Sequence, residues 1–302
     1  MSTDGTDGSP GLVPEPVLES VLGRPGGVVV RCRSAPVTGS SGAATGAVTR
    51  LTGVAACDGA EVAFRVVRKE FRPVRTGRHA PYADDPRHWA YWRREPLAYA
   101  SGLLPYGTEL TAPRCHGVVD DVVYLADVSG SPGSPRVAAR RLGAWQAGAA
   151  VPGVPWLAGH QLAQRLAVGE WTPVDADPRV AGLWRRQEEL LNALARLPVV
   201  LTHGDFSPGN LVASEGRTVV LDWATLGAGP VGADLAALAL GTLADPVPDY
   251  LAGAAGRFRR DDVELGYRAT VALTGAGRVH WMLSRGMRLP EGYEEFVLSQ
   301  AP

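Results

Sequence analysis

The chain has 302 residues, 45% of them hydrophobic and 20% charged, and its net charge is −1. This composition is typical of a globular protein with one large or two modest domains, and the near-zero net charge argues against nucleic acid or a membrane as a partner. No apolar run reaches the ~18 residues of a transmembrane helix. The scattered cysteines (Cys32, Cys57 and Cys115) form no CxxC pattern, which fits a cytoplasmic protein without a zinc knuckle.

The N-terminal third is predicted to be rich in strands. Residues 1–16 have neither the basic nor the apolar region of a secretory signal, and we predict a disordered leader there. The runs at 28–30, 47–51 and 62–69 have the composition of strands. A glycine- and hydroxyl-rich turn, 38–46, joins the first two.

That turn is a candidate phosphate-binding loop, because its backbone N–H groups could lie over the phosphates of ATP. The candidate residues are Ser40, Ser41 and Gly42. The turn is neither a G-x-G-x-x-G nor a Walker motif, so a plain hairpin turn is the alternative.

Lysine usage gives a sharper indication. Lysine and arginine total 30, and Lys69 is the only lysine. Arginine replaces lysine readily on a solvated surface, but not where a compact ammonium must fit a tight site. Lys69 ends a predicted strand, which is where kinase-like folds place the lysine that holds the α- and β-phosphates. The alternative is that Lys69 is an ordinary surface lysine that remains by chance.

A helix is predicted after Asp85-Pro86, since this pair is typical of a helix start. Glu95 in this helix is the expected ion-pair partner of Lys69. Pro96 follows directly and is expected to kink or end the helix, which leaves a solvated Glu95 as the alternative. Glu70 adjoins Lys69 but should point to the opposite face of the strand.

A lobe boundary is predicted after a hairpin over 118–127, where the chain becomes rich in Ser, Gly and Pro at 129–135. We expect a nucleotide-binding N-terminal lobe over 17–127 and a catalytic and substrate-binding C-terminal lobe over 128–302. In two-lobed kinases adenine binds against the backbone that connects the lobes, and a similar arrangement here would place it near Ala126 and Val128. Helical patterns in the second lobe cover 136–148, 156–167, 178–197, 234–243 and 262–284.

The most informative segment runs from His203 to Asp222. Phosphoryl transfer from Mg·ATP needs a carboxylate to accept the proton of the attacking hydroxyl, and an Asn and an Asp to hold metal ions. Asp205 is the predicted base, and Asn210 and Asp222 are the predicted Mg²⁺ ligands because hard oxygen donors suit this ion. Ser207 is a candidate phosphate contact.

Two further polar residues are given structural roles. His203 is expected to hydrogen-bond the loop backbone, with a role as a base as the alternative. Asp234 opens an apolar helix and is expected to be its N-cap, with a second possible role in pinning the catalytic loop through backbone N–H groups.

These residues carry a resemblance. His203-Gly-Asp-x-x-x-x-Asn210, the later Leu-Asp222-Trp and Asp234-Leu-Ala resemble the aminoglycoside phosphotransferase family, which is related to choline kinases and, more distantly, to protein kinases. The resemblance covers about residues 25–245. It implies an α+β, two-lobed protein-kinase-like fold, with a small, mainly antiparallel N-terminal lobe and a larger helical C-terminal lobe. It also implies transfer of phosphate from ATP, with GTP as a possible donor, to a small-molecule hydroxyl.

Differences from the protein-kinase motifs narrow the class of substrate. Gly204 replaces the arginine of His-Arg-Asp, and Trp223-Ala224 follow the metal aspartate. Only 12 positions separate Asp222 from Asp234, too few for a loop that docks a protein substrate. The segment from residue 241 to the end contains 8 acidic residues and 7 arginines. This balance of charge does not indicate a strongly polycationic substrate.

We therefore predict a monomeric or homodimeric kinase of a small molecule, with an antibiotic as the leading acceptor, aminoglycoside-like or another natural product. A metabolic kinase for choline-, sugar- or nucleoside-like substrates is the alternative within enzymes. A nucleotide-binding pseudokinase is the alternative outside them.

Overall fold

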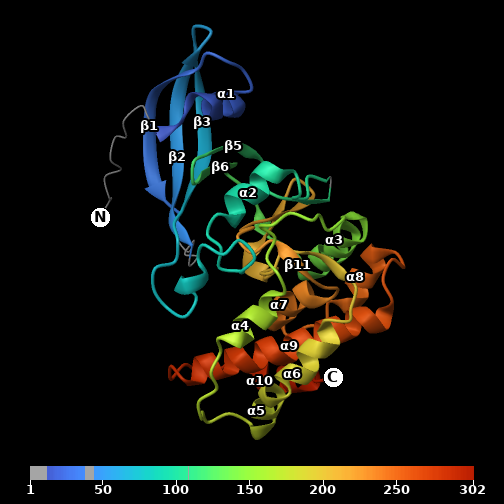
Figure 1. The fold of residues 1–302 in the computed structure, drawn as a ribbon. Coiled ribbons are helices and arrows are strands. Elements are labelled where there is room, and N and C mark those ends of the chain that lie inside the picture. The colour runs from blue at the N-terminus through green and yellow to red at the C-terminus, as the bar shows by residue number, and fades with distance from the viewer. Residues whose placement is uncertain (1–11, 38–43, 108) are drawn as a thin grey trace.

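The computed structural model describes residues 12–37, 44–107 and 109–302. The candidate phosphate-loop residues Ser40, Ser41 and Gly42 lie outside the described residues. The molecule has a sheet-rich N-terminal part and a helical C-terminal part, which Figure 1 shows at opposite ends. This arrangement confirms the predicted two-lobed α+β class, while the exact boundary at residues 127 and 128 stays a prediction.

The N-terminal sheet has the strand order β1-β2-β3-β6-β5 within the described chain, and all its neighbours are antiparallel. Its strands are β1 (Val28–Pro36), β2 (Thr45–Cys57), β3 (Ala60–Phe71), β5 (Cys115–Val119) and β6 (Val122–Ala126). The three predicted strands and the predicted hairpin are therefore present. Lys69 lies on β3 opposite Val48 of β2 and Val123 of β6, so it is held on a central strand.

The range predicted as a leader, 1–16, overlaps the first helix. Helix α1 (Glu15–Leu22) packs on the sheet, and Val13 and Val17 are buried against Leu51 and Phe64. The composition of residues 1–16 resembles a tail, but Val13 within that range, and Val17 just after it, are buried in the cluster beneath α1. Residues 1–11 lie outside the described part of the chain.

Helix α2 (Arg94–Ser101) starts eight residues later than the Asp85-Pro86 pair predicts, since its N-cap is Arg93 and not Asp85. Asp85 instead accepts a hydrogen bond from the backbone of Arg87 in a turn. Pro96 therefore falls in the first turn of α2, where a backbone N–H has no partner within the helix, and it does not break the helix. The prediction that Pro96 kinks or ends the helix at Glu95 is therefore wrong.

The predicted linker forms a short strand. β7 (Ser131–Pro132) pairs with β9 (Leu211–Ser214), which also pairs with β10 (Arg217–Val220); β4 (Leu110–Thr111) completes this sheet. A second small sheet pairs β8 (Val199–Thr202) with β11 (Gly227–Pro230). The His203–Asp222 segment lies between β8 and β11 and itself contains β9 and β10.

Helices fill the C-terminal part, with α9 at its centre (Figure 1). The helices are α3 (Pro135–Gly148), α4 (Gln161–Ala167), α5 (Pro178–Arg185), α6 (Gln187–Leu194), α7 (Ala233–Thr242), α8 (Val247–Ala254), α9 (Arg260–Leu283) and α10 (Tyr293–Ser299). The predicted helix over 178–197 divides at Arg186, and the one over 156–167 begins only at Gln161. No helix in the described residues is both long and apolar enough to cross a membrane.

Candidate active site

The candidate catalytic loop follows β8 and ends in the short 3-10 turn Pro208–Asn210. Gly204 in this loop has φ +81°, and a Cβ there would meet the Gln161 side chain at 1.9 Å and the Thr225 carbonyl at 2.8 Å. Only glycine fits such a position. This close approach gives a physical reason for glycine between His203 and Asp205, where protein kinases have arginine.

His203 holds the loop from beneath and is fully buried. The Asp205 backbone N–H donates to its Nδ1 at 3.2 Å, so the ring proton lies on Nε2, which donates to the Leu221 carbonyl at 2.9 Å. Its ring meets Trp223 edge to face, with centroids 4.6 Å apart. These contacts support the expected structural role rather than that of a base.

Asp234 anchors the same loop. Its two carboxylate oxygens accept hydrogen bonds from the backbone N–H groups of His203 and Gly204, each at 2.8 Å, and one also accepts from Gln146 at 3.1 Å. Burial raises the pKa of Asp234 above its ordinary value, and the two backbone donors oppose that rise. The N-cap of α7 is Gly232, so the predicted N-cap role of Asp234 is wrong and the loop-pinning role is the one observed.

We expect Asp234→Asn to destabilise the protein by about 1–3 kcal/mol, because one loop N–H would face an amide NH₂ and lose its acceptor. Urea unfolding measures the loss. Asp249→Asn, at a surface ion pair with Arg136, is the matched control and should change stability by less than about 1 kcal/mol. Equal stability of the two variants would contradict the anchoring role.

The lone lysine lies in a buried cluster of charges. Lys69 Nζ is 2.6 Å from Glu95 Oε2 and 2.9 Å from Asp222 Oδ1. Lys69 and Glu95 are buried, whereas the Asp222 side chain is 39% exposed. Asp222 has φ +62°, an uncommon conformation for a residue other than glycine, and its carboxylate contacts Lys69 on β3.

Burial and charge act in opposite directions in this cluster. Burial alone would lower the pKa of Lys69, but the carboxylates of Glu95 and Asp222 outweigh it and raise that pKa. Burial raises the pKa of Glu95 to about 7, although Lys69 opposes the rise. The pair is therefore costly to desolvate, as expected of a group kept for function rather than for stability.

The candidate metal ligands lie beside each other in the fold. Asn210 Nδ2 donates to the Asp205 carbonyl at 2.9 Å and to Asp205 Oδ2 at 3.2 Å, which leaves Asn210 Oδ1 to bind a cation. The Leu221 N–H donates to the Asn210 carbonyl at 2.9 Å and so ties this turn to Asp222. An amide oxygen and a carboxylate are donors that fit Mg²⁺.

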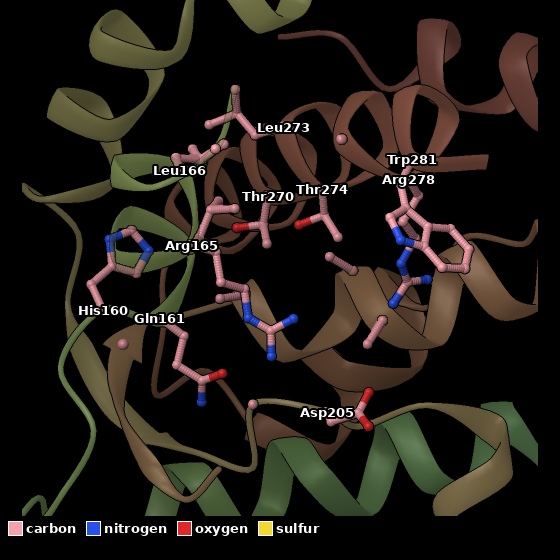
Figure 2. Close-up of a pocket in the computed structure, with 18 of the residues that line it drawn as sticks. His160, Gln161, Arg165, Leu166, Asp205, Thr270, Leu273, Thr274, Arg278 and Trp281 are labelled. Atoms are coloured by element: carbon pink, nitrogen blue, oxygen red, sulfur yellow. The ribbon is translucent and has the colours of Figure 1, made fainter. Parts of the chain in front are cut away.

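Two cavities meet at Asp205. The larger has a volume of about 900 Å³ and lies between α4, α9 and the catalytic loop (Figure 2). The smaller, of about 280 Å³, is lined by Asp205 and Asp222 together with Thr45 of β2. A carboxylate that borders both spaces can contact groups bound in each of them.

Three further residues, Ala126, Val128 and Ser207, are predicted to contact the nucleotide. Ala126 ends β6, and its N–H donates to the Arg114 carbonyl at 2.8 Å. Val128 follows it and is half-buried. The Ser207 backbone accepts from the Asn210 N–H at 3.0 Å, so Ser207 shapes the turn. Their roles toward a nucleotide stay predictions.

Arg94 is a residue that the sequence analysis missed. It is fully buried next to Glu95, and its guanidinium donates to the carbonyls of Pro86, His88, Trp89 and Trp156 at 2.8–2.9 Å. Burial lowers its pKa to about 10. The arginine thus fastens the 86–89 segment, part of which lines the smaller cavity, to α2.

We expect Arg94→Met to lower the free energy of unfolding by about 3–5 kcal/mol, because the variant leaves buried carbonyls without donors. Arg94→Lys should recover only part of the loss, since an ammonium cannot reproduce the planar fork. Chemical denaturation measures both. A loss below about 1 kcal/mol for Arg94→Met would show that water replaces the guanidinium without cost.

The fold is protein-kinase-like, as three solved kinases show. An amicoumacin kinase in complex with AMP-PNP, Ca²⁺ and Ami has a TM-score of 0.52 at 12% identity over 89% of both chains. A choline kinase from Cryptosporidium parvum has a TM-score of 0.52 at 10% identity over 89% of this chain and 87% of the other. A Plasmodium vivax ethanolamine kinase has a TM-score of 0.50 at 11% identity over 89% and 80%.

The sequence itself points to one family. Residues 136–268 match the model of the phosphotransferase enzyme family, APH. This match confirms the predicted resemblance and the predicted enzyme class, a phosphotransferase with an alcohol group as acceptor. A search of curated protein sequences gave no match.

Proposed function

We propose that the protein is a kinase that transfers phosphate from ATP, with Mg²⁺, to a hydroxyl group of a small molecule. The observation that carries this proposal is the position of Asp205 at the junction of two cavities, with Asp222, the ion-pair partner of Lys69, lining the smaller one. The smaller cavity would receive the phosphate end of the nucleotide, and the larger one would receive the acceptor.

In this proposal Asp205 accepts the proton of the acceptor hydroxyl as the oxygen bonds to the γ-phosphorus and the bond to the β-phosphate oxygen breaks. ADP leaves with the electron pair of the broken bond. Lys69 holds the α- and β-phosphates, and Glu95 fixes the lysine in place. Asn210 and Asp222 would hold Mg²⁺, which neutralises phosphate charge when bound.

The proposal also includes the position of the nucleotide, the donor, the location of the protein and the class of acceptor. Adenine would lie against the backbone near Ala126 and Val128, and the turn with Ser40, Ser41 and Gly42 would lie over the phosphates. GTP is the alternative donor. We place the protein in the cytoplasm as a monomer or homodimer, with an antibiotic as the leading acceptor and a choline-, sugar- or nucleoside-like metabolite as the alternative.

The test is a search for product. The protein is incubated with ATP, Mg²⁺ and a mixture of antibiotics and metabolites, and phosphorylated products are detected by mass spectrometry and ³¹P NMR. A product that disappears in Asp205→Ala supports the proposal. ATP binding without any product would favour a pseudokinase instead. Protection of a growing host separates antibiotic inactivation from a metabolic role.

A further inference from the structure

Four arginines line the larger cavity. Arg78 lies between β3 and α2, and Arg165 lies on α4. Arg278 lies on α9, and Arg285 follows the end of that helix. Figure 2 shows the guanidinium groups of Arg165 and Arg278 and the carboxylate of Asp205 facing the same open space. Segments far apart in the sequence therefore bring positive charge to one cavity.

None of the four forms an ion pair with a carboxylate of the described chain. Arg165 lies over the ring of Trp89 at 4.2 Å, and Arg285 lies over Trp281 at 4.7 Å. Burial lowers the pKa of Arg165; the carboxylate of Asp205 opposes this shift, and the positive charges of Arg278 and Arg78 add to it.

The carboxylates that line this cavity do not balance the arginines. They are Asp205, Asp234 and Glu170. Asp234 has both oxygens engaged by the loop backbone, and Asp205 is the proposed base. Only Glu170 would be free to pair with an ammonium group. A polycationic acceptor, whose ammonium groups need several carboxylates, has poor complementarity to this lining.

The four arginines divide into two pairs. Arg78 and Arg165 also line the smaller cavity, beside Asp222, so they are placed to face the phosphoryl group in transfer. Arg278 and Arg285 line only the larger one. Stabilisation of the C-terminal end of α9 is the simpler role for a cation there, and Arg285 serves it, since it donates to the Trp281 carbonyl at 3.4 Å. That effect is confined to the last turn, and Arg278 lies before it, so it does not account for Arg278.

We propose that the acceptor carries an anionic group, a carboxylate or a phosphate, that Arg278 and Arg285 bind while its hydroxyl faces Asp205; this inference rests on the proposed function. Arginine suits such oxyanions because its planar fork donates two parallel hydrogen bonds. The apolar part of the lining, which includes Leu166, Leu273 and Trp281, would contact the body of the molecule. A cavity of about 900 Å³ accommodates a drug-sized acceptor.

The test compares probes that differ in charge on one scaffold. Glucuronate, glucose 6-phosphate, glucose and glucosamine are titrated by calorimetry into the protein with AMP-PNP and Mg²⁺, which blocks transfer. We expect at least one of the two acids to bind at least tenfold more tightly than glucosamine, and the identity of that acid distinguishes a carboxylate from a phosphate site. Equal affinities, a preference for glucosamine, or no binding of either acid would overturn the proposal.

Variants locate the effect. Arg278→Gln should reduce the preference for the acid at least fivefold, whereas Arg278→Lys, which keeps the charge but not the planar fork, should retain part of it. Arg260→Gln, at an exposed pair with Glu264 near the start of the same helix, is the matched control and should leave it unchanged. An unchanged preference in Arg278→Gln, with an unchanged melting temperature, would contradict the assignment. Because binding is measured without transfer, selectivity without any phosphorylated product would refute the proposed function and not this inference.

Discussion

Replacing Asp205 with asparagine is expected to lower kcat for acceptor phosphorylation by about 10²–10⁴-fold, the range typical of a lost general base. Asparagine has the shape of aspartate but cannot take the proton of the attacking hydroxyl. The hydrogen bond that Asn210 donates to Asp205 Oδ2 at 3.2 Å can be kept by the new amide oxygen. The loss should therefore fall on kcat, and initial rates over acceptor concentration measure it.

Nucleotide binding separates this loss from a folding defect. Asp205→Asn should bind AMP-PNP with an affinity close to that of the unaltered protein, because Lys69 and Asp222 are untouched. The control is Asp249→Asn, which removes an equal charge at a distant surface position. A variant that retained more than a tenth of kcat would show that Asp205 is not the base.

Local motifs were the most reliable part of the sequence prediction. The order and spacing of the polar residues from His203 to Asp222 predicted a catalytic loop, and hydrogen bonds within 20 residues hold that segment together. The position of Lys69 was also predictable, since an alternating apolar run indicates a strand. The pairing of Lys69 with Glu95 was anticipated from the kinase pattern, and the structure places their side chains 2.6 Å apart.

Features made by distant segments were not predictable in the same way. The sequence pattern gave no indication that Arg94 would be buried, because its partners are backbone carbonyls, which every residue has. The start of α2 was misplaced because Asp85-Pro86 is equally compatible with a turn. The grouping of Arg165 with Arg278 depends on the packing of α4 against α9, and the balanced charge of residues 241–302 concealed it.

Substitutions of Lys69 should have the second large effect on activity. Lys69→Met is expected to lower kcat/KM for ATP by about 10²–10³-fold, the range found when one preorganised electrostatic donor is removed. Lys69→Arg should be nearly as harmful despite its charge. The ammonium lies between carboxylate oxygens at 2.6 and 2.9 Å in a buried site, and the larger guanidinium does not fit there. Steady-state rates over ATP concentration measure both.

The matched control is Arg65→Lys, the same type of exchange on the same strand. Arg65 pairs with Asp127 at 3.0 Å and its side chain is 54% exposed, so either cation can serve there and kcat/KM should stay within about twofold. A neutral effect at position 65 with a large loss for Lys69→Arg would explain why one lysine persists in a chain that otherwise uses arginine. If Lys69→Arg kept ATP affinity and rate, charge alone would suffice at this position and the proposed phosphate anchor would need no compact ammonium.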